Sequence, residues 1–276
     1  MDEAVTILAE VAAEDGRVLA GGQSLVPMMA FRLAQPGHLV DINGVASLRR
    51  LRREQTELSI GACVRHADFH KPATEGPLGR LLSEVAGNIA HYPIRMRGAF
   101  CGSLAHADPS SEWCLVAATL GAEIRAQSVR GGRAIPAEAF FHGMMSTDLA
   151  PDELLTQARL PLLPPDTAYG FHEFSRRAGD YALAAALAVY RLKDGKIDNA
   201  RLGICGAEAR PRRISEAETI LNGAQPSPRI FRDAAEIAAA SIEPVEDAQV
   251  SAAFRRTLVR TVTERALART LQEKLQ

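Results

Sequence analysis

Apolar residues recur at helical spacing in several segments of the chain. In residues 4–14 they fall on one face of an amphipathic helix, and residues 77–90 show the same period. A third helix is expected over residues 109–120, with Asp108 as its N-cap and Pro109 at its first position. Near the C-terminus the pattern predicts three further helices, at roughly 213–222, 228–241 and 250–274.

Shorter apolar runs, bounded by glycine or proline, predict strands. Residues 122–126 and 133–135 flank Arg130-Gly131-Gly132, an arrangement typical of a hairpin. The basic residues 49–53 precede a strand predicted at 58–62, so we interpret them as the solvated face of a hairpin rather than as a phosphate-binding patch. The remaining strands of this region are expected at 17–20, 39–42 and 154–160.

Three prolines, Pro161, Pro164 and Pro165, interrupt the pattern after the last of these strands. Prolines in such close succession mark a loop between structured regions. We therefore expect two domains, at residues 1–165 and 166–276.

The second domain begins with three apolar segments, at 169–177, 181–192 and 200–207. The first and third are predicted strands. The middle segment is rich in alanine, and helix propensity alone would make it a buried helix.

Two glycine-bearing segments carry the candidate chemistry. The segment Ala20-Gly21-Gly22-Gln23-Ser24 joins a predicted strand to a helix that begins near Leu25. A glycine turn at a helix start leaves several backbone N–H groups unpaired, and these suit a phosphate or a diphosphate. A second segment, residues 97–103, also contains two glycines, so the two segments together are able to hold one diphosphate. Neither segment is a Rossmann fingerprint or a P-loop.

Composition excludes several other classes of function. The chain has 276 residues, is 47% hydrophobic and has a formal net charge of -1, which argues against binding to nucleic acid or to a membrane surface. No apolar run approaches the roughly 20 residues that a membrane helix needs. The acidic residues near Met1 lack the basic region of a secretory signal, so we expect a cytoplasmic protein.

The candidate metal ligands are scattered. The four cysteines, Cys63, Cys101, Cys114 and Cys205, form no C-x-x-C pair, so an iron–sulfur cluster within this chain is not expected. The seven histidines include no H-E-x-x-H motif. We therefore assign no metal site and no catalytic residue.

Three runs together resemble a known family. Residues 20–27, residues 94–109 and the run Phe174-Ser175-Arg176-Arg177-Ala178-Gly179-Asp180-Tyr181-Ala182 look like the FAD-binding medium subunits of molybdenum hydroxylases. The similar types are the carbon monoxide dehydrogenase medium chain and the FAD domain of xanthine dehydrogenase. The runs are spread over most of the chain, and their order and spacing fit the family.

The resemblance implies an α+β fold. A PCMH-type FAD-binding domain with lobes at about 1–50 and 51–165 would precede a small C-terminal domain of antiparallel sheet plus helices. It therefore favours a strand for residues 181–192. It also implies a set of FAD-binding residues, with Glu112 at the adenosine end, Leu149 lining the flavin site and Tyr181 near the isoalloxazine ring. The set comprises Ala20, Gly21, Gly22, Gln23, Ser24, Leu25, Ala99, Phe100, Cys101, Gly102, Ser103, Glu112, Leu149 and Tyr181.

The implied function is electron transfer. A non-covalently bound FAD would take electrons from a [2Fe-2S] small subunit, which receives them from a molybdopterin large subunit, and would pass them to an external acceptor. The expected assembly is a dimer of heterotrimers. Two alternatives remain open: a self-contained FAD-dependent oxidoreductase of the same superfamily, and a flavin-free scaffold subunit.

Two positions depart from the family pattern. The family usually has T-x-G-G-[ND] in the second segment, where this chain has Ala99-Phe100-Cys101-Gly102-Ser103. We expect Cys101 to narrow the space for the diphosphate, and to be strained if its backbone needs a positive φ. A lysine common in the family is also replaced, by His172-Glu173.

Overall fold

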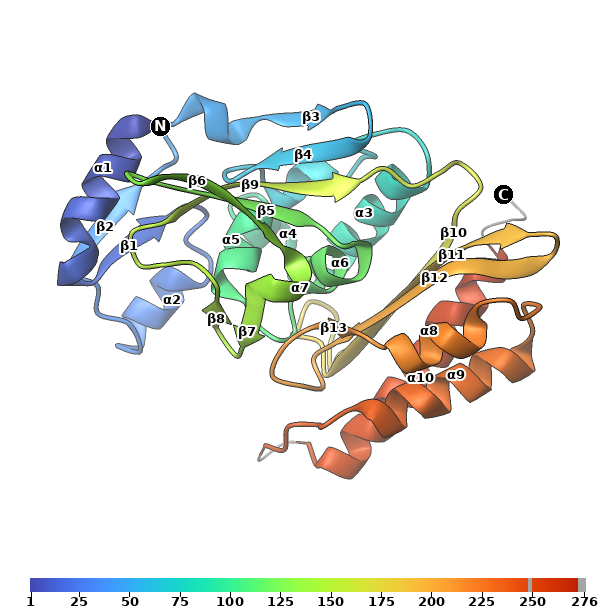
Figure 1. The fold of residues 1–276 in the computed structure, drawn as a ribbon. Coiled ribbons are helices and arrows are strands. Elements are labelled where there is room, and N and C mark those ends of the chain that lie inside the picture. Colours follow the sequence, from blue (N-terminus) through green and yellow to red (C-terminus); the bar gives the residue numbers. More distant parts are fainter. Residues whose placement is uncertain (248–249, 273–276) are drawn as a thin grey trace.

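The computed structural model describes residues 1–247 and 250–272. An N-terminal part holds a small parallel sheet and a five-stranded sheet, and a C-terminal part holds a four-stranded sheet covered by helices (Figure 1). No helix in these two ranges is long and apolar enough to cross a membrane.

The first 41 residues build a parallel pair of strands. One helix precedes the first strand, and a second helix connects the two strands. The amphipathic helix α1 (Asp2–Val11) buries Val5 and Leu8, and its apolar period gives the face that packs on the strands. Strand β1 (Gly16–Leu19) pairs in parallel with β2 (His38–Asp41), and α2 (Leu25–Ala30) lies in the connection between them.

The five-stranded sheet has the order β3-β4-β9-β5-β6, and all its pairings are antiparallel. Residues 49–53 do contribute to a hairpin, because β3 pairs with β4. Helices α3, α5 and α6 pack beneath this sheet (Figure 1). The bounds are β3 (Leu51–Arg53), β4 (Glu57–Gly61), β5 (Glu123–Ser128), β6 (Gly131–Pro136), β9 (Leu154–Pro161), α3 (Pro77–Asn88), α5 (Phe100–His106) and α6 (Glu112–Leu120).

Four short elements complete the N-terminal part. They are α4 (Tyr92–Arg95), α7 (Ala137–Phe140) and the antiparallel pair of β7 (Phe141–Gly143) with β8 (Ser146–Thr147). The pair lies close to α5, because the backbone N–H of Met145 donates to the carbonyl of Ala107 at 3.1 Å.

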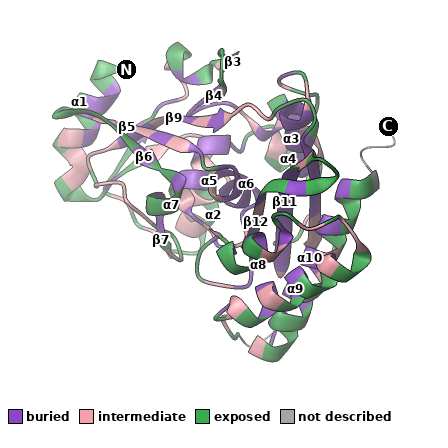
Figure 2. Ribbon diagram, turned by 45° about the vertical axis from the view of Figure 1, so that its right-hand side comes forward, coloured by how far each residue is buried: buried purple, intermediate pink, exposed green. Residues whose placement is uncertain are grey.

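The C-terminal sheet has both faces buried. Its order is β10-β11-β12-β13, all antiparallel, with α8, α9 and α10 on the outer face. The inner face rests on α3 and α6, and Figure 2 shows the buried residues gathered in α6, β11 and β12. The bounds are β10 (Ala168–Phe174), β11 (Ala184–Lys193), β12 (Lys196–Cys205), β13 (Arg212–Arg213), α8 (Ser215–Leu221), α9 (Pro228–Ser241) and α10 (Ala252–Gln272).

The sequence of β11 resembles that of a buried helix because both faces of this strand are buried. Ala185, Leu187 and Val189 join the core of the N-terminal part, while Ala186 and Ala188 join the core under α8–α10. A strand buried on both faces has apolar residues at every position, so it shows no alternation. The family resemblance therefore predicted this element correctly, and propensity did not.

Several predicted boundaries are wrong, among them the start of α6. Helix α6 begins at Glu112 rather than residue 109, and its N-cap is Ser111, whose hydroxyl accepts from the N–H of Cys114 at 3.4 Å. Asp108 instead accepts from the N–H of Ser110, which closes a tight turn before the helix. Tyr181 precedes β11, which begins at Ala184, and α2 ends at Ala30 rather than near Gln35-Pro36-Gly37.

Candidate functional site

The two glycine-bearing segments lie in direct contact, although about eighty residues separate them in sequence. A Cβ atom at Gly21 would lie 2.5 Å from the carbonyl oxygen of Arg97 and 2.8 Å from the Cα of Gly98. Only glycine allows so close an approach of two backbones. Gly22 has a φ of +72°, a left-handed conformation that also favours glycine.

The first segment connects β1 to α2 and is partly exposed throughout. Ser24 is the N-cap of α2, and its hydroxyl makes no capping hydrogen bond to that helix. Gln23 donates its side-chain amide to the carbonyl of Gly21 at 3.2 Å. The segment therefore presents polar groups at an accessible surface, although the N–H of Val26 at the start of α2 already donates to the carbonyl of Gly22.

The second segment is itself the first turn of a helix rather than a loop before one. Ala99 is the N-cap of α5, and Phe100 through Ser103 form its first turn. Within the described residues, the N–H groups of Cys101 and Gly102 donate to no backbone carbonyl. Gly102 is partly exposed, and an added Cβ would meet only the Cβ of Ala99, at 3.6 Å. Two donors without a backbone acceptor thus lie in the segment that Gly21 contacts.

The side chains of Phe100 and Cys101 point away from this space. Phe100 is fully buried, with its ring centroid 4.8 Å from that of Trp113. The Cys101 thiol donates to the carbonyl of Ile60 at 3.4 Å in the core, and burial raises its pKa well above the usual value. The expectation that Cys101 narrows the diphosphate space is therefore wrong. Its backbone is helical, so it needs no positive φ.

His66 packs against the second segment, and no motif in the sequence points to it. Its Nδ1 accepts from the indole N–H of Trp113 at 2.9 Å, and a Cβ at Gly98 would lie 2.5 Å from its Nε2. Burial, and then the charges of Arg65 and Arg95, lowers the pKa of His66 to about 4. The ring is therefore neutral at physiological pH and acts as a packing and acceptor group.

Leu149 lies in a loop that Arg133 of β6 clamps. The guanidinium of Arg133 contacts the carboxylates of Asp148 and Glu153, both within 2.7 Å, and Glu153 also accepts from the N–H of Ala150 at 2.8 Å. These ion pairs hold the pKa of Glu153 below its usual range, against the effect of its burial. Leu149 itself is partly buried against the core, so its position is well defined.

Glu112 and Tyr181 lie where the two parts of the chain meet. The first turn of α6 contacts α5, since the thiol of Cys114 donates to the carbonyl of Ser103 at 3.4 Å. Glu112 is buried there against Glu173 of β10, and burial together with that neighbouring carboxylate raises its pKa. Tyr181 is 66% exposed. Partial burial and the nearby Asp108 and Glu112 raise the pKa of its phenol.

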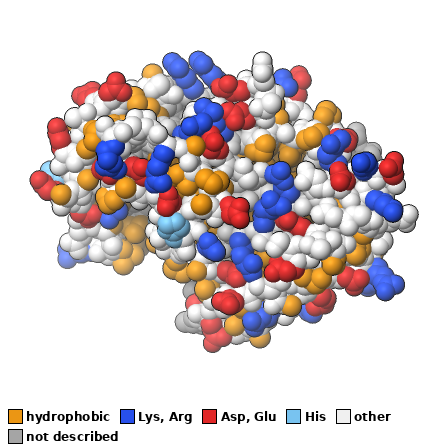
Figure 3. Space-filling view, in the orientation of Figure 1, with side chains coloured by type: hydrophobic (Ala, Val, Ile, Leu, Met, Phe, Trp, Pro, Cys, Tyr) orange, Lys and Arg blue, Asp and Glu red, His pale blue; other side chains and the backbone are white. Residues whose placement is uncertain are grey.

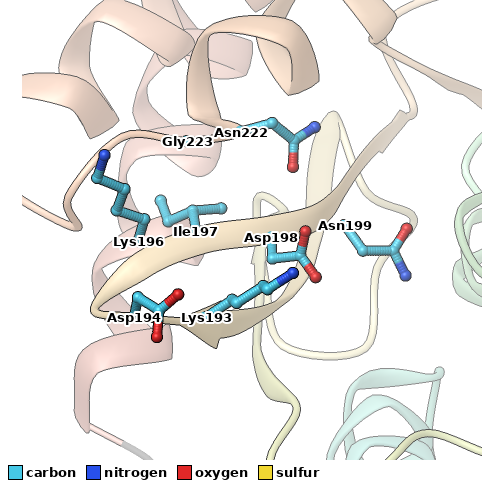
Figure 4. A pocket seen from close by; sticks show the side chains of 8 residues that line it. All are labelled: Lys193, Asp194, Lys196, Ile197, Asp198, Asn199, Asn222 and Gly223. Carbon is cyan, nitrogen blue, oxygen red and sulfur yellow. The ribbon is translucent and has the colours of Figure 1, made fainter.

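Two hollows in the described surface lie elsewhere. The larger, of about 560 Å³, is formed by the β11–β12 hairpin and the turn at Asn222 and Gly223 (Figure 4). The amide of Asn222 already bonds the N–H of Ala200 and the carbonyl of Glu218, each at 2.9 Å. A smaller hollow, of about 300 Å³, is lined by residues at the end of α3 and in α4 and, opposite them, by Glu173 and Gly179. Among the described residues, no group of three or more His, Cys, Asp or Glu is placed to hold a metal ion.

Comparisons with known proteins identify the family. Residues 1–163 match the FAD binding domain in molybdopterin dehydrogenase, and residues 169–270 match the CO dehydrogenase flavoprotein C-terminal domain. The chain is 38% identical, over 272 residues, to the 6-hydroxypseudooxynicotine dehydrogenase complex subunit alpha of Paenarthrobacter nicotinovorans. The match covers 98% of this chain and 92% of that relative.

Two solved structures share the fold over almost their full length. A chain of the carbon monoxide dehydrogenase from Hydrogenophaga pseudoflava superposes with a TM-score of 0.93 at 32% identity, covering 98% of this chain and 94% of that one. A chain of the quinoline 2-oxidoreductase from Pseudomonas putida 86 gives a TM-score of 0.92 at 34% identity, with 100% and 95% covered. The chain therefore belongs to the FAD-binding medium subunits of molybdenum hydroxylases, which are flavoprotein subunits of oxidoreductases.

Proposed function

We propose that this subunit binds one FAD without a covalent bond, with the diphosphate between residues 20–25 and residues 99–103. The residues present fit the group. Gly21 brings the two backbones together, and in the described residues the N–H groups of Cys101 and Gly102 in the adjoining helix start donate to no backbone carbonyl. A helix start of this kind favours negative charge, through both its free donors and its dipole.

We further propose that three residues contact the rest of the cofactor. Glu112 would bind the adenosine end, Leu149 would line the flavin site, and Tyr181 would limit solvent access to the isoalloxazine ring. The contact of α6 with α5, through the thiol of Cys114 and the carbonyl of Ser103, supports the assignment of Glu112, two residues earlier in the same helix. The ion pairs of Arg133 fix the loop that carries Leu149, and Tyr181 is free to contact a ligand because it is mostly exposed.

The bound FAD would supply the redox chemistry, and the chain would supply its position and surroundings. We propose that electrons arrive from a [2Fe-2S] small subunit, that a molybdopterin large subunit oxidises the substrate, and that the complex is a dimer of heterotrimers. Exposed apolar side chains on and after α2 suit such a partner: Val26 is 52%, Phe31 77% and Leu33 74% exposed. Helix α2 lies at the lower left in Figure 1, and Figure 3, in the same orientation, shows hydrophobic side chains in that region.

The open space above Gly102 carries the proposal, and it also provides a test. In Gly102→Ala, the added methyl has room in the chain itself, and alanine favours a helix by about 1 kcal/mol over glycine. The fold should therefore be as stable as the wild type or more so. The same methyl would stand where the diphosphate approaches the backbone, so the Kd for FAD should rise at least tenfold.

The matched control is Gly87→Ala, which adds a methyl in open space on α3. Titration of the apoprotein with FAD, followed by flavin fluorescence, measures both variants beside thermal unfolding. The control should bind FAD as the wild type does. Unchanged FAD affinity in Gly102→Ala would show that the diphosphate does not approach this turn.

A further inference from the structure

Asn43 lies directly beneath the first glycine-bearing segment. Its side-chain amide donates to the carbonyl of Ala20 at 2.7 Å and to the carboxylate of Asp41 at 2.6 Å. Arg49 donates to the backbone carbonyl of the same asparagine. Contacts with Asp41 and Arg49 therefore fix Asn43 in place while its side-chain amide binds the backbone of the first segment.

Arg65 joins Asn43 to the second segment. One terminal nitrogen of its guanidinium donates to Oδ1 of Asn43 and the other to the carbonyl of Arg97, each at 2.5 Å. The carbonyl of Arg97 is the same atom that stands closest to the missing Cβ of Gly21. The hydrogen bonds thus run from Ala20 through Asn43 and Arg65 to the point where the two backbones touch.

The backbone around Arg65 is fixed against the second segment as well. The N–H of His66 donates to the carbonyl of Gly98, and the N–H of Phe100 to the carbonyl of Val64, both at 3.0 Å. The carboxylate of Asp68 accepts from the N–H of Arg65 at 2.8 Å. The backbone of Arg65 is therefore fixed. Its guanidinium can determine the distance between Asn43 and the carbonyl of Arg97.

We propose that Asn43 and Arg65 are positioning residues that hold the two segments at the separation a diphosphate requires. The inference rests on the proposed FAD site. A planar guanidinium presents its donors in a rigid fork that can hold two acceptors at a fixed separation, whereas an ammonium group on a flexible stem has no such fixed geometry. Neither residue needs to touch the cofactor, because each acts through the backbone atoms it binds.

The test uses the full chain with three variants: Asn43→Ala, Arg65→Lys and the double variant. Arg65→Lys keeps the charge and loses the bridge, and Arg53→Lys on the exposed strand β3 is its matched control. Each single variant should raise the Kd for FAD roughly tenfold to a hundredfold, about 1.4–2.7 kcal/mol, because the two segments lose the bond that fixes their separation. The control should change the Kd less than twofold.

Two readouts separate positioning from a general loss of structure. Each of the two substitutions breaks the same bridge. The free-energy change of FAD binding in the double variant should therefore be clearly smaller than the sum of the changes in the two single variants. ADP carries the diphosphate without the flavin, so calorimetric titration with ADP should show the same fold-loss as FAD. The melting temperature of the apoprotein should stay within a few degrees in Arg65→Lys, which keeps this arm valid even if Asn43→Ala folds poorly.

Each contrary outcome is decisive. Wild-type FAD affinity in Arg65→Lys, fully additive effects, or a loss for FAD without a loss for ADP would overturn the proposal. So would a wild-type chain that binds FAD but not ADP. A wild-type chain that binds no FAD would instead refute the proposed function itself.

Discussion

The thiol of Cys101 lies in the core, while the backbone of the same residue belongs to the proposed diphosphate site. The family pattern marks the position as unusual, but a linear sequence does not show which way a side chain points from the first turn of a helix. Once α5 is in place, the thiol donates to the carbonyl of Ile60 in β4, while the backbone N–H of Cys101 has no backbone acceptor in the described residues. The departure from the family is therefore a change in packing.

Cys101→Gly should therefore destabilise the chain. The variant loses a buried side chain and places a second glycine in the first turn of α5, which alone costs about 1 kcal/mol. Urea unfolding measures the loss. Cys101→Ala serves as the reference, because it keeps the helix propensity and should cost less. A glycine variant that is more stable than the alanine variant would contradict this account.

The carboxyl pair of Glu112 and Glu173 should make stability depend on pH. Burial is the largest cause that raises the pKa of each group above its ordinary value of 4.5. Above that value the folded chain holds more protons than the unfolded chain, so the free energy of unfolding should fall as the pH rises through neutral. Glu173→Gln removes one carboxyl and the repulsion on the other, so this fall should become shallower.

Urea unfolding at a series of pH values from 5 to about 8 measures this effect. The control is Glu75→Gln, which removes an exposed carboxyl and should leave the slope as in the wild type. An equal slope in Glu173→Gln and the wild type would mean that both carboxyls are ionised in the folded chain.

At the scale of elements, the start of α6 depends on which of two candidate caps is used. Ser111 caps the helix, so Ser111→Ala should lower the free energy of unfolding by about 1 kcal/mol. Asp108→Ala removes a turn contact, but it also removes a negative charge near the buried Glu112. Its loss in the free energy of unfolding should therefore be smaller. Urea unfolding of both variants decides between the caps, and a larger loss in Asp108→Ala would restore the earlier helix start.

The sequence predicts elements well where a single signal marks each end. Helix α9 spans residues 228–241 as expected, because Ser227 and Pro228 form an unambiguous start. The hairpin at Gly131 is correct for the same reason. The start of α6 was misplaced because Asp108 and Ser111 are both good caps. Nothing local tells a reader that Arg65 bridges to Asn43, since that contact exists only in the folded chain.

At the scale of the whole molecule, the isolated chain should bind FAD and yet oxidise no substrate of the complex. In the proposed function substrate oxidation belongs to a molybdopterin subunit, so the isolated chain would lack its source of electrons. Assays with nicotine, quinoline or carbon monoxide and an electron-accepting dye test this directly, with the reconstituted complex as the positive control. Dye reduction by the isolated chain would favour a self-contained oxidoreductase.

The sheet β10–β13 is shared by two cores, one with α3 and α6 and one with α8–α10. Polar contacts tie the same boundary, since Gly206 donates to the carbonyl of Pro109 at 2.7 Å and Arg201 to that of Leu120 at 2.5 Å. The two family segments are thus not interchangeable modules. A chimaera that took residues 166–276 from a relative would expose mismatched cores unless α6 were exchanged with them. Recombination between such genes is therefore expected to preserve the two halves as a pair.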